Sequence, residues 1–342
     1  MELLRDSIPM VSLAVSAAAL YARAASSCVR PGFPRLAALL PIVAFLAAAP
    51  FAFSSTIARG LAGFFLAWLG VFKVLLLAAG RGPLDPTLPV LPFVFTAALP
   101  VKLRRGGPGA AGASAASKAK SMSLIVSCAV KVAVIAALLH AYQFIDQLHL
   151  YMRLALYGVH IYFFLELLLP CLAAAGGALG MEMGPQFDRP YLASSLRDFW
   201  GRRWNLMVSA ILRPSVYDPV RARDGKAAAT LATFLVSGLM HEAMVYYLTL
   251  RLPTGEMTAF FLLHGVCCVG EALCARRWAA RGWPPPPRPV ATLLVVAFLT
   301  GTAFWLFFPP ICREGSEEAL LEEWAAVAAF FEDAGRKLLR YV

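Results

Sequence analysis

The chain consists of apolar blocks of about 20 residues separated by shorter polar loops. A helix of that length crosses a hydrocarbon core about 30 Å thick, and a helix satisfies its backbone hydrogen bonds without water. Proline and glycine mark the gaps between the blocks, as in the run Pro284–Pro287. The pattern predicts an all-α, polytopic transmembrane bundle with about eight spans, at residues 8–27, 36–53, 57–79, 121–141, 150–175, 227–250, 258–275 and 289–308.

Two segments between these spans predict other structures. Residues 88–99 are apolar but short and contain Pro89 and Pro92, so we expect a re-entrant or interfacial segment. Residues 104–120 are rich in Gly, Ala, Ser and Lys, which predicts a flexible loop. The sequence contains no internal repeat and no boundary of a soluble domain, so residues 1–342 are expected to form a single integral membrane domain.

The C-terminal residues 316–341 predict an amphipathic helix. Apolar residues recur there at helical spacing, with acidic residues early and basic residues late, as the helix dipole favours. Such a helix can lie on the membrane surface or pack on the bundle, and the pattern leaves both open. Further interfacial helices are expected in the long loop at residues 176–226.

Composition supports the membrane assignment. Apolar residues make up 60% of the chain and charged residues 15%. In soluble domains about half of the residues are apolar and about a quarter are charged. The net charge is +11, but 20 of the 31 Lys and Arg lie in the loops after the first, third, fifth and seventh spans. These loops are therefore expected in the cytosol, with both termini in the lumen. The basic charge then faces lipid headgroups, and nucleic acid is not an expected partner.

The first apolar block also has features of a signal peptide. Its apolar core is followed by Ala22, Arg23 and Ala24, which resembles a small-residue cleavage site. Cleavage would reverse the side of every later loop, against the distribution of basic residues. We therefore expect an uncleaved first helix.

Ionisable side chains inside the spans are costly and need a physical reason. We expect Lys73 and Lys131 to extend their amines toward the membrane surface. For the histidines and glutamates the ordinary explanation is hydrogen bonding between helices. The candidates are Lys73, Lys131, His160, Glu166, His241, Glu242, His264 and Glu271.

His241 is the strongest candidate for chemistry. It lies about 14 residues into its span, or about 21 Å from the cytosolic end. Gly238, one turn earlier, is expected to leave room where a substrate approaches. A neutral imidazole can take the proton of a hydroxyl group. The sequence after His241 lacks the second histidine of HExxH, so a zinc protease is not expected and no metal site is expected. The absence of GxSxG and of a phosphate-binding loop likewise argues against a serine hydrolase and a nucleotide phosphate site.

The loop at 176–226 contains two unusual sequences, FWGRRWN at residues 199–205 and LRPSVYDPV at residues 212–220. Trp200 and Trp204 suit the headgroup level of a membrane. Arg202, Arg203 and Arg213 suit phosphate oxygens, such as those of an acyl-CoA. Anchoring to lipid headgroups explains the same residue types.

Together with SGLMHE at residues 237–242, these motifs resemble the plant wax synthase branch of the membrane-bound O-acyltransferase superfamily. The resemblance is most specific over residues 187–250. It implies transfer of a fatty acyl group from acyl-CoA to a long-chain alcohol, giving wax ester and free CoA, by an integral protein of the endoplasmic reticulum. It implies that His241 is the base for the alcohol and that Asn205 positions the thioester or stabilises developing charge.

The resemblance also implies that acyl-CoA is the co-substrate and that no other cofactor is needed. The expected partners are acyl-CoA, a lipid alcohol and membrane lipids, and the oligomeric state is left open. A sterol acceptor is the alternative within the class. The alternative from another class is a transporter with an intramembrane path through His160, Glu166, His241 and His264.

Overall fold

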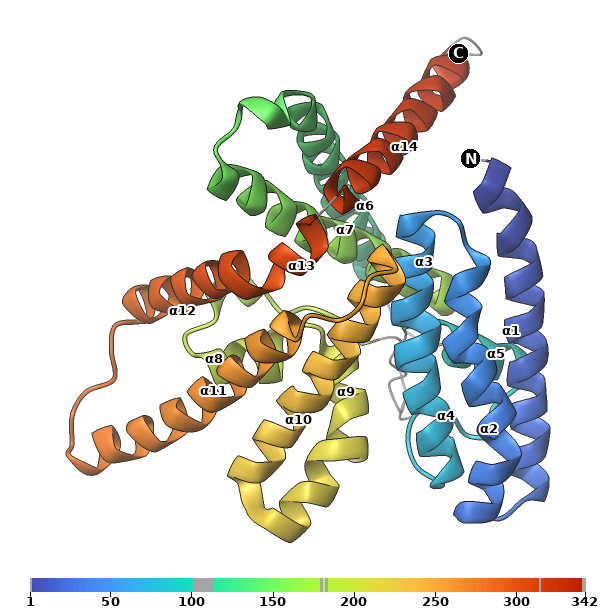
Figure 1. The fold of residues 1–342 in the computed structure, drawn as a ribbon, viewed down its shortest axis with the longest axis horizontal. Helices are drawn as coiled ribbons and strands as arrows, with labels where there is room; N and C mark the ends of the chain where they lie inside the picture. Colours follow the sequence, from blue (N-terminus) through green and yellow to red (C-terminus); the bar gives the residue numbers. More distant parts are fainter. Residues whose placement is uncertain (1, 101–113, 179–180, 182–183, 314, 340–342) are drawn as a thin grey trace.

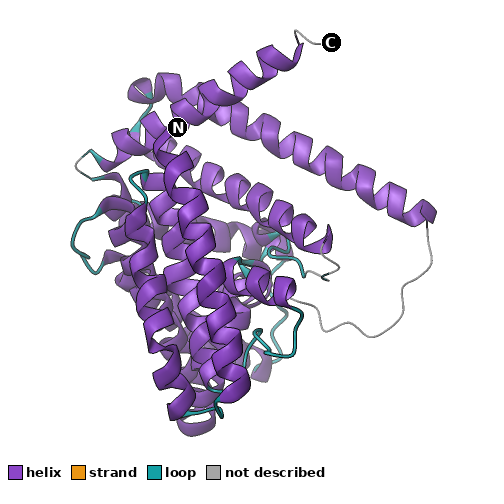
Figure 2. Ribbon diagram, turned by 90° about the vertical axis from the view of Figure 1, so that its right-hand side faces the viewer, coloured by secondary structure: helices purple, strands orange, loops and turns teal. Residues whose placement is uncertain are grey.

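The computed structural model describes residues 2–100, 114–178, 181, 184–313 and 315–339 (Figure 1). Figure 2 shows that this part of the chain contains helices and loops only. The predicted membrane-spanning helical bundle is therefore confirmed. Among the described residues, 8 helical segments are long and apolar enough to span a membrane, namely Ile8–Cys28, Phe33–Ala52, Thr56–Ala78, Val126–Gln147, Leu150–Gly177, Leu206–Thr249, Glu256–Ala280 and Arg288–Phe307.

The helices follow one another along the chain in two halves, where η marks 3₁₀- or π-helical segments. The N-terminal half contains α1 (Glu2–Cys28), α2 (Phe33–Ala48), η1 (Ala49–Ala52), α3 (Thr56–Ala62), η2 (Gly63–Gly70), α4 (Val71–Ala78), α5 (Val90–Ala98), α6 (Ser114–Ala141), η3 (Tyr142–Gln147) and α7 (Leu150–Ala178). The C-terminal half contains η4 (Pro190–Leu192), α8 (Leu196–Asp198), η5 (Phe199–Arg203), α9 (Leu206–Leu212), η6 (Arg213–Tyr217), α10 (Asp218–Thr249), α11 (Glu256–Ala280), α12 (Arg288–Thr302), η7 (Ala303–Phe307), α13 (Pro309–Cys312) and α14 (Ser316–Leu339).

The apolar run Leu206–Thr249 is a helical hairpin rather than one span. Gly225 has φ 86°, which reverses the chain inside α10, and glycine adopts this left-handed region without a side-chain clash. Figure 1 shows the two arms, residues 206–224 and residues 226–249, running side by side. Met207 and Ile211 of the first arm pack near Met240 and Met244 of the second. Part of the predicted cytosolic loop thus runs alongside the sixth predicted span.

Close contacts at glycines hold this second arm against its neighbours. A Cβ atom at Gly238 would lie 2.8 Å from the Cα atom of Thr258 in α11. On another face, Cβ atoms at Gly60 and Gly63 would lie within 2.9 Å of side-chain atoms of Leu248 and Tyr247, respectively. The expectation that Gly238 leaves room for a substrate is therefore wrong, because the backbone of α11 fills that room.

Buried charged side chains form hydrogen bonds to backbone carbonyl groups that are left unpaired at the ends of helices. Lys73 is fully buried and donates from Nζ to the carbonyl oxygens of Thr96 and Leu99, at 2.7 and 2.6 Å, at the end of α5. The prediction that its amine extends to the membrane surface is thus wrong, since four carbonyls at a helix end need donors. The buried Arg59 likewise donates to the carbonyl oxygens of Tyr247 and Leu248, where α10 ends.

Lys131 also has a partner inside the bundle. Its amine lies 3.8 Å from the carboxylate of Glu166 in α7 and donates to the carbonyl oxygen of that residue at 3.1 Å. Lys131 therefore bonds to a neighbouring helix, and the prediction that its amine extends toward the membrane surface is wrong.

The C-terminal helix α14 is attached to the bundle near its start. Glu323 accepts hydrogen bonds from the backbone N–H groups of Thr56 and Ile57, at 2.6 and 2.9 Å, and so caps α3. Glu317 binds Arg153 of α7. The part of α14 that contains these residues therefore packs on the bundle, and the later part projects beyond its neighbours in Figure 1.

Two segments expected to lack a spanning helix have different outcomes. Residues 88–99 contain only the short helix α5, as expected, and α5 packs beside α1. Of the predicted flexible loop at 104–120, residues 104–113 lie outside the described residues. Residues 114–120 form the start of α6, so the loop prediction is wrong for that part.

The contact at Gly238 gives a stability prediction. Gly238→Ala is expected to lower the free energy of unfolding by about 1–3 kcal/mol, because its methyl group meets backbone that has no rotamer to change. Gly270→Ala in α11 is the matched control, because nothing lies within 4 Å of a Cβ atom there. Thermal unfolding of both purified variants in detergent checks the prediction. Equal stability of the two variants would contradict it.

Candidate active site

His241 lies in the second arm of α10 with one ring nitrogen engaged. Its Nδ1 atom is 2.7 Å from the carbonyl oxygen of Ser237. Because a carbonyl oxygen only accepts, Nδ1 carries the proton and the lone pair of the neutral ring is on Nε2. Within the described chain Nε2 has no hydrogen-bond partner. This tautomer is the one that a proton acceptor at Nε2 requires.

The His241 ring is enclosed by aromatic side chains from three other elements. Its centroid lies 4.1 Å from that of Phe261 in α11, 4.9 Å from that of Trp68 in η2 and 6.4 Å from that of Phe307 in η7. Such walls exclude water and present an apolar surface. The cage is a suitable place for the reacting end of a lipid.

Two other histidines inside the spans, His264 and His160, bond to side chains of neighbouring elements, although Nε2 of His160 is buried without a partner in the described chain. His264 is fully buried, with Nδ1 at 3.0 Å from the Phe260 carbonyl oxygen and Nε2 at 3.2 Å from the Thr302 hydroxyl group. His160 pairs with the hydroxyl group of Tyr142 at 2.8 Å. The bonds to Thr302 and Tyr142 join neighbouring elements, so His264 and His160 match the ordinary packing explanation.

The FWGRRWN motif lies beside the His241 cage. Trp200 of η5 contacts Phe261 at 5.6 Å and His264 at 5.6 Å between ring centroids. Phe261 is therefore shared by Trp200 and His241. Trp204 stacks on Phe199 at 5.4 Å, within a second aromatic cluster. Both indoles pack on protein aromatics, which differs from the simple headgroup anchoring that their composition allowed.

Asn205 begins the first arm of the hairpin. Its φ is 39°, a left-handed conformation that asparagine tolerates, and its Oδ1 atom accepts the N–H of Val208 at 3.3 Å. Its amide nitrogen donates to no group in the described chain, which leaves two donors for a ligand.

Asn205 and His241 lie at similar heights along the hairpin. The arm 206–224 rises roughly 28 Å from the bend at Gly225, and His241 lies roughly 24 Å above the same bend in the other arm. The sequence placed Asn205 at the cytosolic surface with His241 deeper. The similar heights arise because the chain between the two residues folds back on itself at Gly225, and the expected difference in membrane depth stays a prediction.

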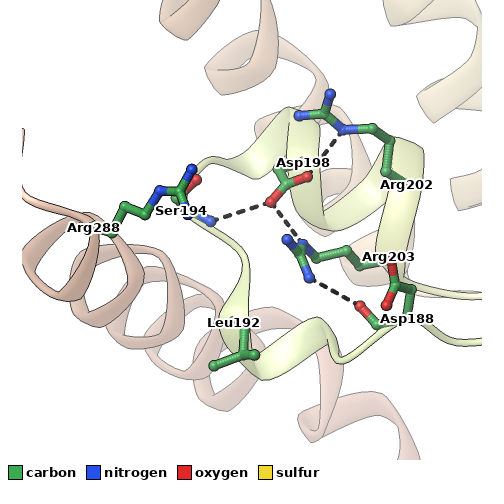
Figure 3. A pocket seen from close by; sticks show the side chains of 7 residues that line it. All are labelled: Asp188, Leu192, Ser194, Asp198, Arg202, Arg203 and Arg288. Carbon is green, nitrogen blue, oxygen red and sulfur yellow. Dashed lines mark hydrogen bonds and ion pairs between the residues drawn. The ribbon is translucent and has the colours of Figure 1, made fainter. Parts of the chain in front are cut away.

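Arginines and acidic residues line a cavity of about 340 Å³ beside this motif (Figure 3). The nearly buried carboxylate of Asp198 accepts from Arg202 Nε at 3.0 Å and from Arg203 Nε at 2.7 Å. Arg203 also donates to the carbonyl oxygen of Asp188 at 3.1 Å. The lining consists of Asp188, Leu192, Ser194, Asp198, Arg202, Arg203 and Arg288.

Asp198 holds the two motif arginines in place as an anion. Burial opposes its ionisation, but hydrogen bonds from Arg203 and the Ser194 N–H, with the charges of Arg203 and Arg202, lower its pKa below the usual value. With three arginines and two aspartates, the cavity lining has an excess of positive charge. It is suited to an anion such as a phosphate group.

The structure adds one arginine to the predicted set and separates another from it. Arg288, at the start of α12, lines the cavity, although only its place in a basic loop pointed to it. Arg213 does not line the cavity. Its guanidinium lies 3.7 Å from Asp218, further along the first arm of the hairpin.

Residues 183–263 match a protein-family model described as the membrane bound O-acyl transferase family. The chain is 36% identical over 91% of its length to acyl-CoA–sterol O-acyltransferase 1 of Arabidopsis thaliana, covering 92% of that protein. It is 39% identical over 87% of its length to a probable long-chain-alcohol O-fatty-acyltransferase 1 of the same plant, covering 89% of it. A long-chain-alcohol O-fatty-acyltransferase of Simmondsia chinensis is 38% identical over 86% of each chain.

The fold and these similarities define an integral, multi-pass membrane acyltransferase. The chain belongs to the membrane-bound O-acyltransferase family, as the sequence motifs indicated.

The two functions of Asn205 can be separated by mutation. Asn205→Asp keeps the oxygen that caps α9 and tolerates the left-handed backbone, but it removes both amide donors. We expect normal protein levels and thermal stability, with acyl transfer lowered about tenfold or more. Asn205→Ala should in addition lose about 1 kcal/mol of stability through the cap. Full activity of Asn205→Asp in isolated membranes would show that only the cap matters.

Proposed function

We propose that this enzyme transfers a fatty acyl group from acyl-CoA to a long-chain alcohol, forming a wax ester and free CoA. The observation that carries the proposal is His241, with Nδ1 bonded to Ser237 and Nε2 free inside an aromatic cage. The names of the alcohol acyltransferases among the relatives supply the substrate class.

In the proposed reaction His241 is the general base. Its Nε2 atom takes the proton of the alcohol as the alcohol oxygen attacks the thioester carbonyl carbon. The tetrahedral intermediate collapses, the carbon–sulfur bond breaks, and the proton passes from Nε2 to the departing sulfur. The carbonyl oxygen of Ser237 accepts a hydrogen bond from Nδ1–H throughout and stabilises the transient imidazolium. Acyl-CoA is the co-substrate, and the steps require neither a further cofactor nor an acyl-enzyme.

The remaining candidate residues bind the acyl donor in this proposal. Asn205 directs its amide donors toward the thioester, and the aromatic rings of Trp200 and Trp204 form walls beside it. The cavity with Arg202, Arg203 and Arg288 binds phosphate groups of the coenzyme. The acceptor arrives from the lipid phase, and the enzyme acts in the endoplasmic reticulum. The motif block at 187–250 is thus the catalytic part of a single domain over residues 1–342.

A sterol is the second candidate acceptor. The observation that favours it is the similarity to the Arabidopsis acyl-CoA–sterol acyltransferase, which extends over 91% of the chain. Both acceptors present one hydroxyl group on an apolar body, so the same base serves either of them.

The base is tested with His241→Ala in microsomes from a host without ester synthesis of its own. Labelled palmitoyl-CoA is supplied with hexadecanol in one tube and a sterol in another. We expect His241→Ala to be present at normal levels and to form ester at least about a hundredfold more slowly. His140→Ala is the matched control, because His140 is exposed at the end of α6 and should keep full activity.

The two tubes also decide the acceptor. More ester from hexadecanol than from the sterol supports the proposed alcohol, and the reverse result supports the sterol. Retained activity of His241→Ala would refute the role of the base.

The cavity is tested with the double variant Arg202→Gln/Arg288→Gln. These two arginines are exposed, and Arg202 bonds Asp198, whereas Arg203 bonds both Asp198 and the carbonyl oxygen of Asp188, so its loss would disturb the loop more. We expect the KM for acyl-CoA to rise about fivefold or more with kcat little changed, because binding is lost uniformly. The KM for an acyl-pantetheine thioester, which lacks the nucleotide phosphates, should not change. Arg276→Gln, at an exposed position in α11, is the control.

A further inference from the structure

Trp68 is a buried tryptophan that sequence reasoning did not select. It lies in the π-helical segment η2 and is 2% exposed. Single π-helical turns are often found at functional sites. The close contacts of Gly60 with Leu248 and of Gly63 with Tyr247 align η2 antiparallel to α10. Continuing that alignment brings Trp68 opposite His241.

The Trp68 indole meets the His241 imidazole directly. The ring centroids are 4.9 Å apart and the planes are inclined by 70°, an edge-to-face contact. Phe64 lies on another side of the indole at 5.4 Å. The indole is therefore part of the wall that surrounds the proposed base.

The polar atom of Trp68 has no protein partner. Its Nε1 atom is buried and forms no hydrogen bond with any described residue. An indole N–H is a donor only, and a buried donor without an acceptor is costly and needs an explanation. The indole N–H of Trp200 has no partner in the described chain either, but the ring contacts of Trp200 are with other side chains, Phe261 and His264 among them, rather than with His241.

We propose that the Trp68 indole N–H donates a hydrogen bond to the oxygen of the reacting acyl carbonyl, beside His241. This inference rests on the proposed acyl transfer. As the alcohol oxygen bonds to the carbonyl carbon and Nε2 of His241 takes its proton, one electron pair of the C=O bond moves onto the carbonyl oxygen. The indole stabilises that charge. When the pair returns, the carbon–sulfur bond breaks and the sulfur receives the proton from His241.

Trp68 and His241 then have complementary functions. The indole cannot accept the proton that the base removes, so it does not compete with the imidazole. A donor in a dry, fixed position stabilises the transition state more than the ground state, because the charge develops only during the reaction.

The kinetic test uses Trp68→Phe and a variant with 3-benzothienylalanine at position 68. The second side chain keeps the shape of indole and replaces N–H by sulfur. We expect both to lower kcat about a hundredfold at normal protein levels. Trp305→Phe is the matched control, since Trp305 is 68% exposed in η7 and should keep full activity.

A binding test separates hydrogen bonding from packing. Two inhibitors are compared. An S-(2-oxoalkyl)-CoA has a ketone oxygen near the position of the thioester carbonyl, and an S-alkyl-CoA has no carbonyl group in its alkyl chain. With either Trp68 variant, the inhibition constant of the ketone should rise roughly 3- to 10-fold, and that of the thioether should stay within about twofold.

Equal weakening of both inhibitors, or near-normal kcat with benzothienylalanine, would overturn the inference and leave Trp68 as a packing residue. Failure of the proposed function itself is recognised separately, because the unmodified enzyme would then form no ester with either acceptor. Loss of activity in His241→Ala but not in the Trp68 variants would refute only the function of Trp68.

Discussion

The ends of helices in an apolar environment expose backbone groups that no water can satisfy, and the architecture of this protein depends on meeting that requirement. Charged side chains meet it at several places. Lys73 and Arg59 donate to the carbonyl ends of α5 and α10, and Glu323 accepts from the N-terminal end of α3. Glu242 and Glu271 do the same for α11 and α8. Each of these bonds joins two elements, so it also fixes their relative position.

The candidate active site is a consequence of these positions. Arg59 and the glycines of α3 and η2 hold the end of α10 against the N-terminal helices, and Glu242 and Gly238 hold α10 against α11. His241 lies between the two contacts. Its aromatic cage therefore consists of residues that are far apart in the sequence but are held by rigid neighbours. A preorganised environment of this kind is what acyl transfer by a general base requires.

Most of the ionisable residues in the spans bond to neighbouring elements, whereas the hydrogen bond of His241 is to Ser237 in its own helix. The partners of Lys73 and Lys131 are backbone carbonyls and a glutamate, and both ring nitrogens of His264 are engaged. The sequence identified His241 by its motif and its depth. It could not distinguish a histidine with a free nitrogen from one that is fully bonded, because that difference depends on atoms from other helices.

The sequence by itself determined the spans, the family and the motif residues, because apolar block length and local motifs are properties of contiguous chain. Only the tertiary structure decided that residues 206–224 fold back along α10, that α11 fills the space beside Gly238, and that Arg288 joins the arginine cavity. The same is true of Trp68, whose place beside His241 follows from the packing of η2 on α10. These relations arise between segments distant in the sequence, where the pattern of apolar residues gives a helix its length but not its neighbours.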